Sequence, residues 1–173
     1  MLTAHIIHEQ PKETAIYKCS LTYAERFLRR KRLETDCGIS FVLDLEKTTN
    51  LNHGDHIELN DGTRVTILAK PERLAALRGT NLMELAWHVG NRHTPCEVVD
   101  DQLLVQRDHV IEHMIEHLGG KVEHVTRPFN PMGGAYGHGR THSHEHGVSA
   151  HVHTHKRSDF NGHAMAITGF SNW

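Results

Sequence analysis

The chain has 173 residues, of which 38% are hydrophobic and 23% are charged, with a formal net charge of −2. This length suits one domain or two small ones, and the charge balance provides no bulk positive field for nucleic acid or an anionic membrane. No apolar run approaches the roughly 18 residues of a membrane span, and residues 1–8 lack the pattern of a secretory signal. We therefore expect neither nucleic acid nor a membrane as a partner.

The numbers of cysteines and histidines narrow the class of protein further. The three cysteines, Cys19, Cys37 and Cys96, are odd in number and widely scattered, which argues against a disulfide framework and for the cytoplasm. Histidine is the outlier, with 18 residues. Imidazole binds nickel, zinc, copper and iron and changes charge near neutral pH, so the count indicates either metal binding or pH sensing.

Residues 1–70 have the pattern of short strands and turns. Residues 40–45 are apolar and partly alternating, while residues 56–59 and 63–68 alternate more clearly on either side of Asp61-Gly62. Glycine adopts the positive φ that a tight hairpin needs. This pattern predicts a small N-terminal all-β domain over residues 1–70.

Residues 71–136 alternate between strand and helix patterns. Strands are predicted over residues 73–78, 95–99, 102–105 and 121–126, although the composition of residues 73–78 alone would also permit a helix. Asn81 is a plausible N-cap for a first helix that ends at Gly90, and Asp108 caps a second helix that ends at Gly119-Gly120. The apolar residues expected on the core faces of these helices are Leu82, Leu85, Ala86 and Val89, then Val110, Ile111, Met114, Ile115 and Leu118. The order β-α-β-β-α-β predicts a ferredoxin-like domain and, for the whole chain, the α+β class.

Residues 137–173 form a histidine-rich tail that we expect to be largely disordered without metal, because few apolar residues are present to drive folding. Imidazoles recur there at every second residue, so a flexible chain can wrap two or three of them around one divalent ion. The tail histidines that we take as metal ligands are His138, His142, His144, His146, His151, His153 and His155, with His163 further along. Such clusters select poorly among metals, so zinc or copper is expected to bind in vitro beside nickel.

Other histidines lie in the predicted folded part. His93 follows the end of the first helix, and a lone loop histidine of this kind is more often a hydrogen-bonded surface residue than a ligand. In a twofold dimer, however, one such histidine becomes a facing pair. Cys96 is close enough in sequence to add a thiolate, although strand alternation favours an ordinary buried cysteine. A basic run over residues 28–32 is either a solvated face or a dock for an acidic partner.

The second helix carries His109, His113 and His117 at intervals of four residues. An i, i+4 pair can chelate a metal, so His109 is a candidate for a peripheral site, while a plain solvated face suits His113 and His117 as well. The string from His109 through Glu112 to His113 also matches H-x-x-E-H, a zinc-peptidase pattern. A second match at residues 113–117 suggests chance, and a peptidase needs a third ligand and a cleft that so small a domain hardly provides.

Three segments together resemble the urease accessory protein UreE family. They are Gly90-Asn91-Arg92-His93-Thr94-Pro95, then Asp108-His109-Val110, then residues 129–137, which read FNPMGGAYG before the tail. Residues 51–55 and Asp61-Gly62 are also similar to that family's first domain. The resemblance covers the chain up to about Gly137.

The resemblance implies a non-enzymatic, homodimeric nickel chaperone that donates Ni²⁺ for assembly of the urease active site. It implies that His93 is the central ligand, one from each subunit, completed by a tail histidine such as His138, His142 or His144. It also implies a peripheral ligand at His109, although Arg107 stands where some relatives carry another histidine. The N-terminal domain is expected to bind partner proteins, and an accessory GTPase and apo-urease are the expected partners. A nickel or zinc storage protein and an H-x-x-E-H zinc peptidase remain the alternatives.

Overall fold

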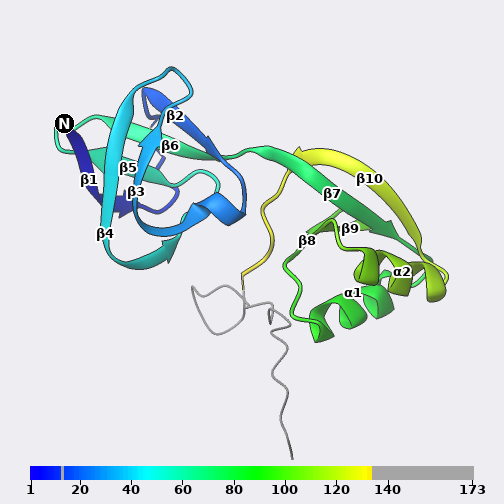
Figure 1. Cartoon of the computed structure of the whole chain (residues 1–173). Helices are drawn as coiled ribbons and strands as arrows, with labels where there is room; N and C mark the ends of the chain where they lie inside the picture. Colours follow the sequence, from blue (N-terminus) through cyan, green and yellow to red (C-terminus); the bar gives the residue numbers. More distant parts are fainter. Residues whose placement is uncertain (13, 134–173) are drawn as a thin grey trace, which may run out of the picture. The chain divides into compact units, whose positions relative to one another are not determined.

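The computed structural model of the chain describes residues 1–12 and 14–133, so the predicted tail over residues 137–173 lies outside the described part (Figure 1). Its strands form one sheet of six and one sheet of four. The elements in chain order are β1 (Leu2–His8), β2 (Tyr17–Leu21), the 3-10 helix η1 (Ala24–Arg26), β3 (Phe27–Glu34), β4 (Ser40–Asn50), β5 (His56–Leu59), β6 (Arg64–Ala69), β7 (Pro71–Arg78), α1 (Leu82–Asn91), β8 (Cys96–Val99), β9 (Gln102–Gln106), α2 (His109–His117) and β10 (Lys121–Pro128). The expected α+β class is confirmed.

The N-terminal sheet has the strand order β2-β6-β5-β1-β4-β3. Two of its pairings, β1 with β4 and β2 with β6, are parallel, and the others are antiparallel. The edge strand β2 approaches the end of β3, because the Asp36 backbone N–H donates to the Lys18 carbonyl at 2.8 Å. The sheet is therefore curled. Cys19 lies buried within β2, whereas Cys37 is exposed in a turn.

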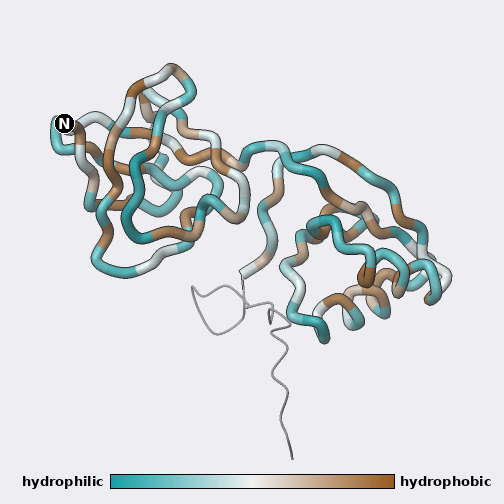
Figure 2. Tube along the Cα trace, in the orientation of Figure 1, coloured by the Kyte–Doolittle hydropathy of each residue, from teal (hydrophilic) through white to brown (hydrophobic). Residues whose placement is uncertain are grey.

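The predicted hairpin around Asp61-Gly62 joins β5 to β6. Gly62 has a φ of +82°, and the Asp61 carboxylate accepts a hydrogen bond from the Thr63 backbone N–H at 2.9 Å. Alternation along the two strands then directs Ile57 and Val65 into the core of the sheet. Figure 2 shows how apolar stretches recur along the strands of both sheets.

The second sheet has the order β10-β7-β9-β8 with every neighbouring pair antiparallel. Numbered within the βαββαβ unit, this order is 4-1-3-2, so the expected ferredoxin-like arrangement is confirmed. Asn81 caps α1 by accepting from the Glu84 backbone N–H at 3.3 Å, and Asp108 caps α2 by accepting from Val110 N–H at 2.8 Å. Helix α1 runs one residue beyond the predicted stop at Gly90.

Both faces of this sheet are covered, which explains why the central residues of β7, Leu74 to Leu77, are all buried. Ala75 and Leu77 pack with the buried residues of α1 and α2 on one face. Leu74 and Ala76 pack on the other face with Tyr23 and with Phe129, which follows β10. No helix in the described residues is long and apolar enough to cross a membrane.

Candidate metal centre

His93 lies at the corner where α1 ends. Its backbone N–H donates to the Gly90 carbonyl at 2.9 Å, directly after the C-cap residue Arg92. His93 has a φ of +53°, in the left-handed region that glycine usually occupies just after a helix. Holding a residue with a Cβ there costs about 1–2 kcal/mol. A strained backbone at an exposed imidazole is typical of a functional position.

The corner is fixed against the second helix. The Arg92 guanidinium Nε donates to the Met114 sulfur at 3.0 Å, and Met114 belongs to α2. Val89, the last buried residue of α1, is fully enclosed in the core between helices and sheet. The His93 backbone is therefore placed by rigid elements, while its side chain stays open to solvent.

An exposed apolar stripe runs along α1 toward this corner. Met83 is 83% exposed and Trp87, one helical turn later, is 62% exposed. The Trp87 ring stands edge-on to the neighbouring His88 ring, with centroids 4.9 Å apart. Large apolar side chains exposed in this way are typical of a surface that binds another protein.

The histidines of α2 form one ladder along the helix. His109 is its first residue, and His113 and His117 follow at the i, i+4 spacing predicted from the sequence. All three are exposed. Across residues 1–12 and 14–133, no group of three or more histidines, cysteines and acidic residues is close enough to hold a metal ion. A metal at His109 would therefore need ligands from elsewhere.

Glu112, the acid of the H-x-x-E-H string, is held by the side chains of Arg107 and His124. Its carboxylate accepts from Arg107 Nε at 2.6 Å and lies 3.0 Å from His124 Nε2 on β10. The Arg107 guanidinium, and after it the His124 ring, hold the pKa of Glu112 below its ordinary range. A carboxylate stabilised as the anion and tied to a guanidinium is a poor general base, which argues against the peptidase alternative.

Cys96 is half-buried in β8 and packs against the core between the helices and the sheet. Burial raises the pKa of its thiol to about 11. At neutral pH it is therefore protonated, and the thiolate is the form that binds metal. This favours the expected structural role of Cys96 over a ligand role beside His93.

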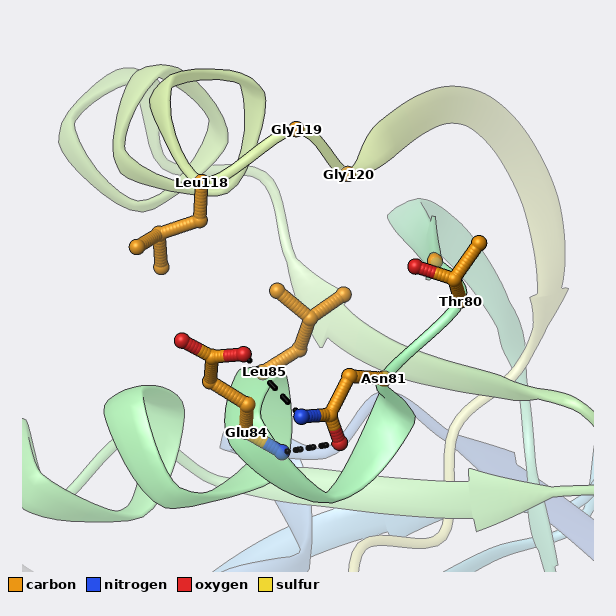
Figure 3. A pocket seen from close by; sticks show the side chains of 8 residues that line it. Thr80, Asn81, Glu84, Leu85, Leu118, Gly119 and Gly120 are labelled. Atoms are coloured by element: carbon orange, nitrogen blue, oxygen red, sulfur yellow. Dashed lines mark hydrogen bonds between the residues drawn. The ribbon is translucent and has the colours of Figure 1, made fainter.

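A small hollow of about 50 Å³ lies between the start of α1 and the end of α2 (Figure 3). Asn81 and Glu84 line it, joined by the two hydrogen bonds of the helix cap, and Leu118 and Gly119 face them. It has room for a few water molecules and is far smaller than a typical ligand pocket. Its lining includes no histidine or cysteine, so it does not belong to the candidate metal centre.

The chain after β10 returns to β8. Phe129 is fully buried, the Asn130 N–H donates to the Glu97 carboxylate at 2.7 Å, and the Met132 N–H donates to the Cys96 carbonyl at 2.9 Å. The tail histidines follow this segment but lie outside the described residues. The sequence indicated the FNPM segment as a motif; it contained no signal that Glu97 would bind this segment, or that His124 would bind Glu112.

The structure thus places His93 at an exposed, rigid corner and His109 at the start of α2, without joining them into one described site. Of the sequence-predicted ligands, His138, His142, His144, His146, His151, His153 and His155 cannot be placed, since they lie beyond residue 133.

Comparison with known proteins covers nearly all of the chain. The N-terminal domain of the UreE urease accessory protein matches residues 3–70, and its C-terminal domain matches residues 72–156. The urease accessory protein UreE of Ruegeria pomeroyi is 50% identical over 129 residues, covering 75% of this chain and 87% of that protein. Its counterpart in Cereibacter sphaeroides is 53% identical over 127 residues, covering 73% and 69%. The counterpart in Ruegeria sp. strain TM1040 is 45% identical over 142 residues, covering 82% and 81%. The chain therefore belongs to the urease accessory protein UreE family.

Proposed function

We propose that the protein is a nickel metallochaperone that collects Ni²⁺ and donates it for assembly of the urease active site in the cytoplasm. The observation that carries this proposal is His93, an exposed imidazole held at φ +53° on a corner fixed by Arg92 and Met114. A rigid backbone with an open side chain suits a ligand that must bind a metal and later release it. Membership of the UreE family supplies the urease context.

The metal site is proposed to form between two copies of the chain. Met83 and Trp87 present apolar surface on α1, and burying that surface against its own symmetry mate would stabilise a twofold dimer. His93 lies at the end of the same helix. An axis near this corner would bring two His93 side chains together, so that each subunit contributes one ligand.

The tail is proposed to supply the remaining ligands. Two imidazoles leave an ion with open positions, and histidines from His138 onward can fill them. Imidazole and water ligands at a partly open site exchange, whereas an enclosed four-cysteine site does not. The histidine-rich tail also favours a second candidate function. In that function the protein stores nickel or zinc, and His93 has no part.

The recipient is proposed to be an accessory GTPase that carries nickel to apo-urease. The N-terminal sheet offers a surface for protein partners, because Arg29, Arg30, Lys31 and Arg32 are all exposed on its edge strand β3. Arg30 is partly engaged by Asp44, with 3.6 Å between Arg30 Nε and the Asp44 carboxylate. A run of exposed cations on an edge strand suits an acidic partner, and it also discourages pairing with other edge strands.

Equilibrium dialysis against nickel tests the proposal. A full-length chain with all eight histidines from His138 to His163 changed to Asn, here called the tail-substituted chain, isolates what the folded part binds. A site shared across a twofold axis predicts about half an ion per chain, lost in His93→Ala. His117→Ala, which removes another exposed histidine on the helix α2, serves as the control and should bind like its parent.

Storage predicts a different pattern. In that case the tail-substituted chain binds no nickel with useful affinity, and His93→Ala in the otherwise unchanged chain binds as much as its parent. Retention of the half ion in the tail-substituted His93→Ala chain would also exclude the shared site.

A further inference from the structure

A single residue joins the N-terminal sheet to the second sheet. Strand β6 ends at Ala69 and β7 begins at Pro71, so only Lys70 lies between them. The Lys70 N–H donates to the Leu21 carbonyl at 2.9 Å, which ties this connection back to the N-terminal sheet. So short a connection limits the distance between the two sheets, but rotation about its single bonds remains possible. Contacts across this boundary, here called the joint, must therefore fix the orientation of one sheet relative to the other.

Tyr23, which precedes η1, packs onto the second sheet. Its side chain is buried among four apolar residues of that sheet and of the segment after β10, namely Leu74, Ala76, Leu104 and Phe129. The Tyr23 and Phe129 rings meet edge-on, with centroids 5.4 Å apart. The Tyr23 N–H also donates to Glu72 Oε1 at 2.8 Å, while Gln106 Nε2 donates to the other oxygen of the same carboxylate at 2.8 Å. Glu72 is thus held on the second sheet by Gln106 and bonds across the joint to Tyr23.

Arg26 bonds to both sides of the joint. It is 1% exposed, and its guanidinium lies over the Tyr23 ring, 5.7 Å from the centroid. On the N-terminal side, Nη1 donates to the Leu51 carbonyl at 3.3 Å. On the other side, the guanidinium donates to the Phe129 carbonyl and, at 3.3 Å, to the Asn130 side-chain oxygen. A planar guanidinium presents five donors in a fixed fork, so one side chain can hold acceptors from both sides together.

Arg26 also lies next to the basic strand of the N-terminal sheet. It is the last residue of η1, and β3 begins at the next residue and carries the run of exposed cations at residues 29–32. On the other side of the joint, the Asn130 N–H donates to Glu97 on β8, the strand that follows the His93 corner. A fixed joint therefore keeps the basic run and the His93 corner at a constant separation within one chain.

We propose that Arg26 is a clasp that holds the N-terminal sheet and the βαββαβ unit in one orientation. The clasp is independent of the proposed nickel function, although it would give a partner docked on β3 a constant approach to His93. Removing the guanidinium leaves the apolar contacts of Tyr23 and Phe129 in place, so the joint should open more often without either sheet unfolding. Losing a hydrogen bond made by a charged group should raise the population of the open joint about tenfold or more.

Amide hydrogen exchange in the full-length chain, followed by NMR, tests the clasp. The Tyr23 N–H bonds across the joint to Glu72, so it exchanges with solvent when the joint opens. Arg26→Gln should speed exchange at Tyr23 about tenfold or more. That exchange should respond little to low concentrations of urea, because opening the joint exposes far less surface than unfolding does. Arg26→Lys keeps the charge but not the planar fork of donors, so its Tyr23 amide should exchange nearly as fast as in Arg26→Gln.

Two further variants separate the clasp from general damage. Asn130→Ala removes an acceptor of the guanidinium from the opposite side of the joint and leaves the N-terminal sheet unchanged, so it should speed exchange at Tyr23 about fivefold. Arg29→Gln is the matched control, because the Arg29 Nε donates to the Leu45 carbonyl at 3.3 Å inside the N-terminal sheet. It should leave exchange at Tyr23 within about twofold of the parent rate.

Residual dipolar couplings of the parent measure the orientation directly, and the amides of both sheets should fit one alignment tensor. Two different tensors would overturn the inference, since the sheets would then move independently. The inference also fails if Arg26→Gln and Asn130→Ala leave exchange at Tyr23 unchanged. Faster exchange that rises with urea as steeply as exchange in the core strand β5 would likewise overturn it, because Arg26 would then stabilise the fold in general and not the joint.

Discussion

Phe129 offers the sharpest test of how the second sheet is covered. Its side chain is fully buried, packs with Leu74, Ala76 and Leu104, and meets the Tyr23 ring edge-on with centroids 5.4 Å apart. Truncating a buried phenylalanine to alanine costs about 3–5 kcal/mol. The aromatic pair contributes about 0.5–1.5 kcal/mol of that loss. We therefore expect Phe129→Ala to lower the free energy of unfolding by about 4 kcal/mol.

Urea unfolding followed by circular dichroism measures this change. Met132→Ala is the matched control, because Met132 lies in the same segment but is 70% exposed; its effect should stay within about 0.5 kcal/mol. A loss below about 1 kcal/mol in Phe129→Ala would refute the reasoning. It would mean that the segment after β10 does not seal the sheet in solution.

Three further predictions follow from named residues. Glu112→Gln should destabilise the protein at neutral pH, because a carboxylate whose pKa is depressed in the folded state stabilises that state only while it is ionised. The difference in stability between Glu112→Gln and the parent should therefore vanish as the pH falls through the lowered pKa of Glu112. Urea midpoints at pH 7 and at acid pH check this, and a stability difference that grows on acidification would contradict it. His93→Gly should be more stable than His93→Ala by about 1 kcal/mol in the same urea assay, since glycine tolerates the left-handed corner; equal stabilities would show that the corner is not strained. Nickel binding should fall steeply below about pH 6, because protonated imidazole cannot ligate; dialysis showing undiminished binding at pH 5 would exclude histidine ligation.

Much of the second domain could be predicted from local patterns. Asn81 and Asp108 act as helix caps, and the βαββαβ order emerged from the strand and helix periodicities. These signals are local because a cap or an amphipathic face involves residues only a few positions apart. The hairpin at Asp61-Gly62 belongs to the same class of signal.

Features that join distant parts of the chain could not be predicted in this way. The parallel pairings of β1 with β4 and of β2 with β6 leave no mark on alternation within a strand. The hydrogen bonds between Asn130 N–H and the Glu97 carboxylate and between His124 and Glu112 depend on which strands become neighbours. His93 was singled out by its place after a helix and by family resemblance, whereas its positive φ became visible only in the structure.

The boundaries at residues 70 and 136 remain proposals. The sheets divide the described residues between β6 and β7, close to the first of these positions. The second position and the tail beyond it lie outside the described residues, as do the seven predicted tail ligands from His138 to His155.

Nickel is proposed to reach urease through His93. Activation of apo-urease under limiting nickel, with the other accessory proteins present, tests it most directly. The His93→Ala chain should fail to support activation above the level seen without the protein, although its tail still binds nickel, and His117→Ala should support activation fully. Full activation by His93→Ala, with activation lost only in the tail-substituted chain, would contradict the account and assign the function to the tail.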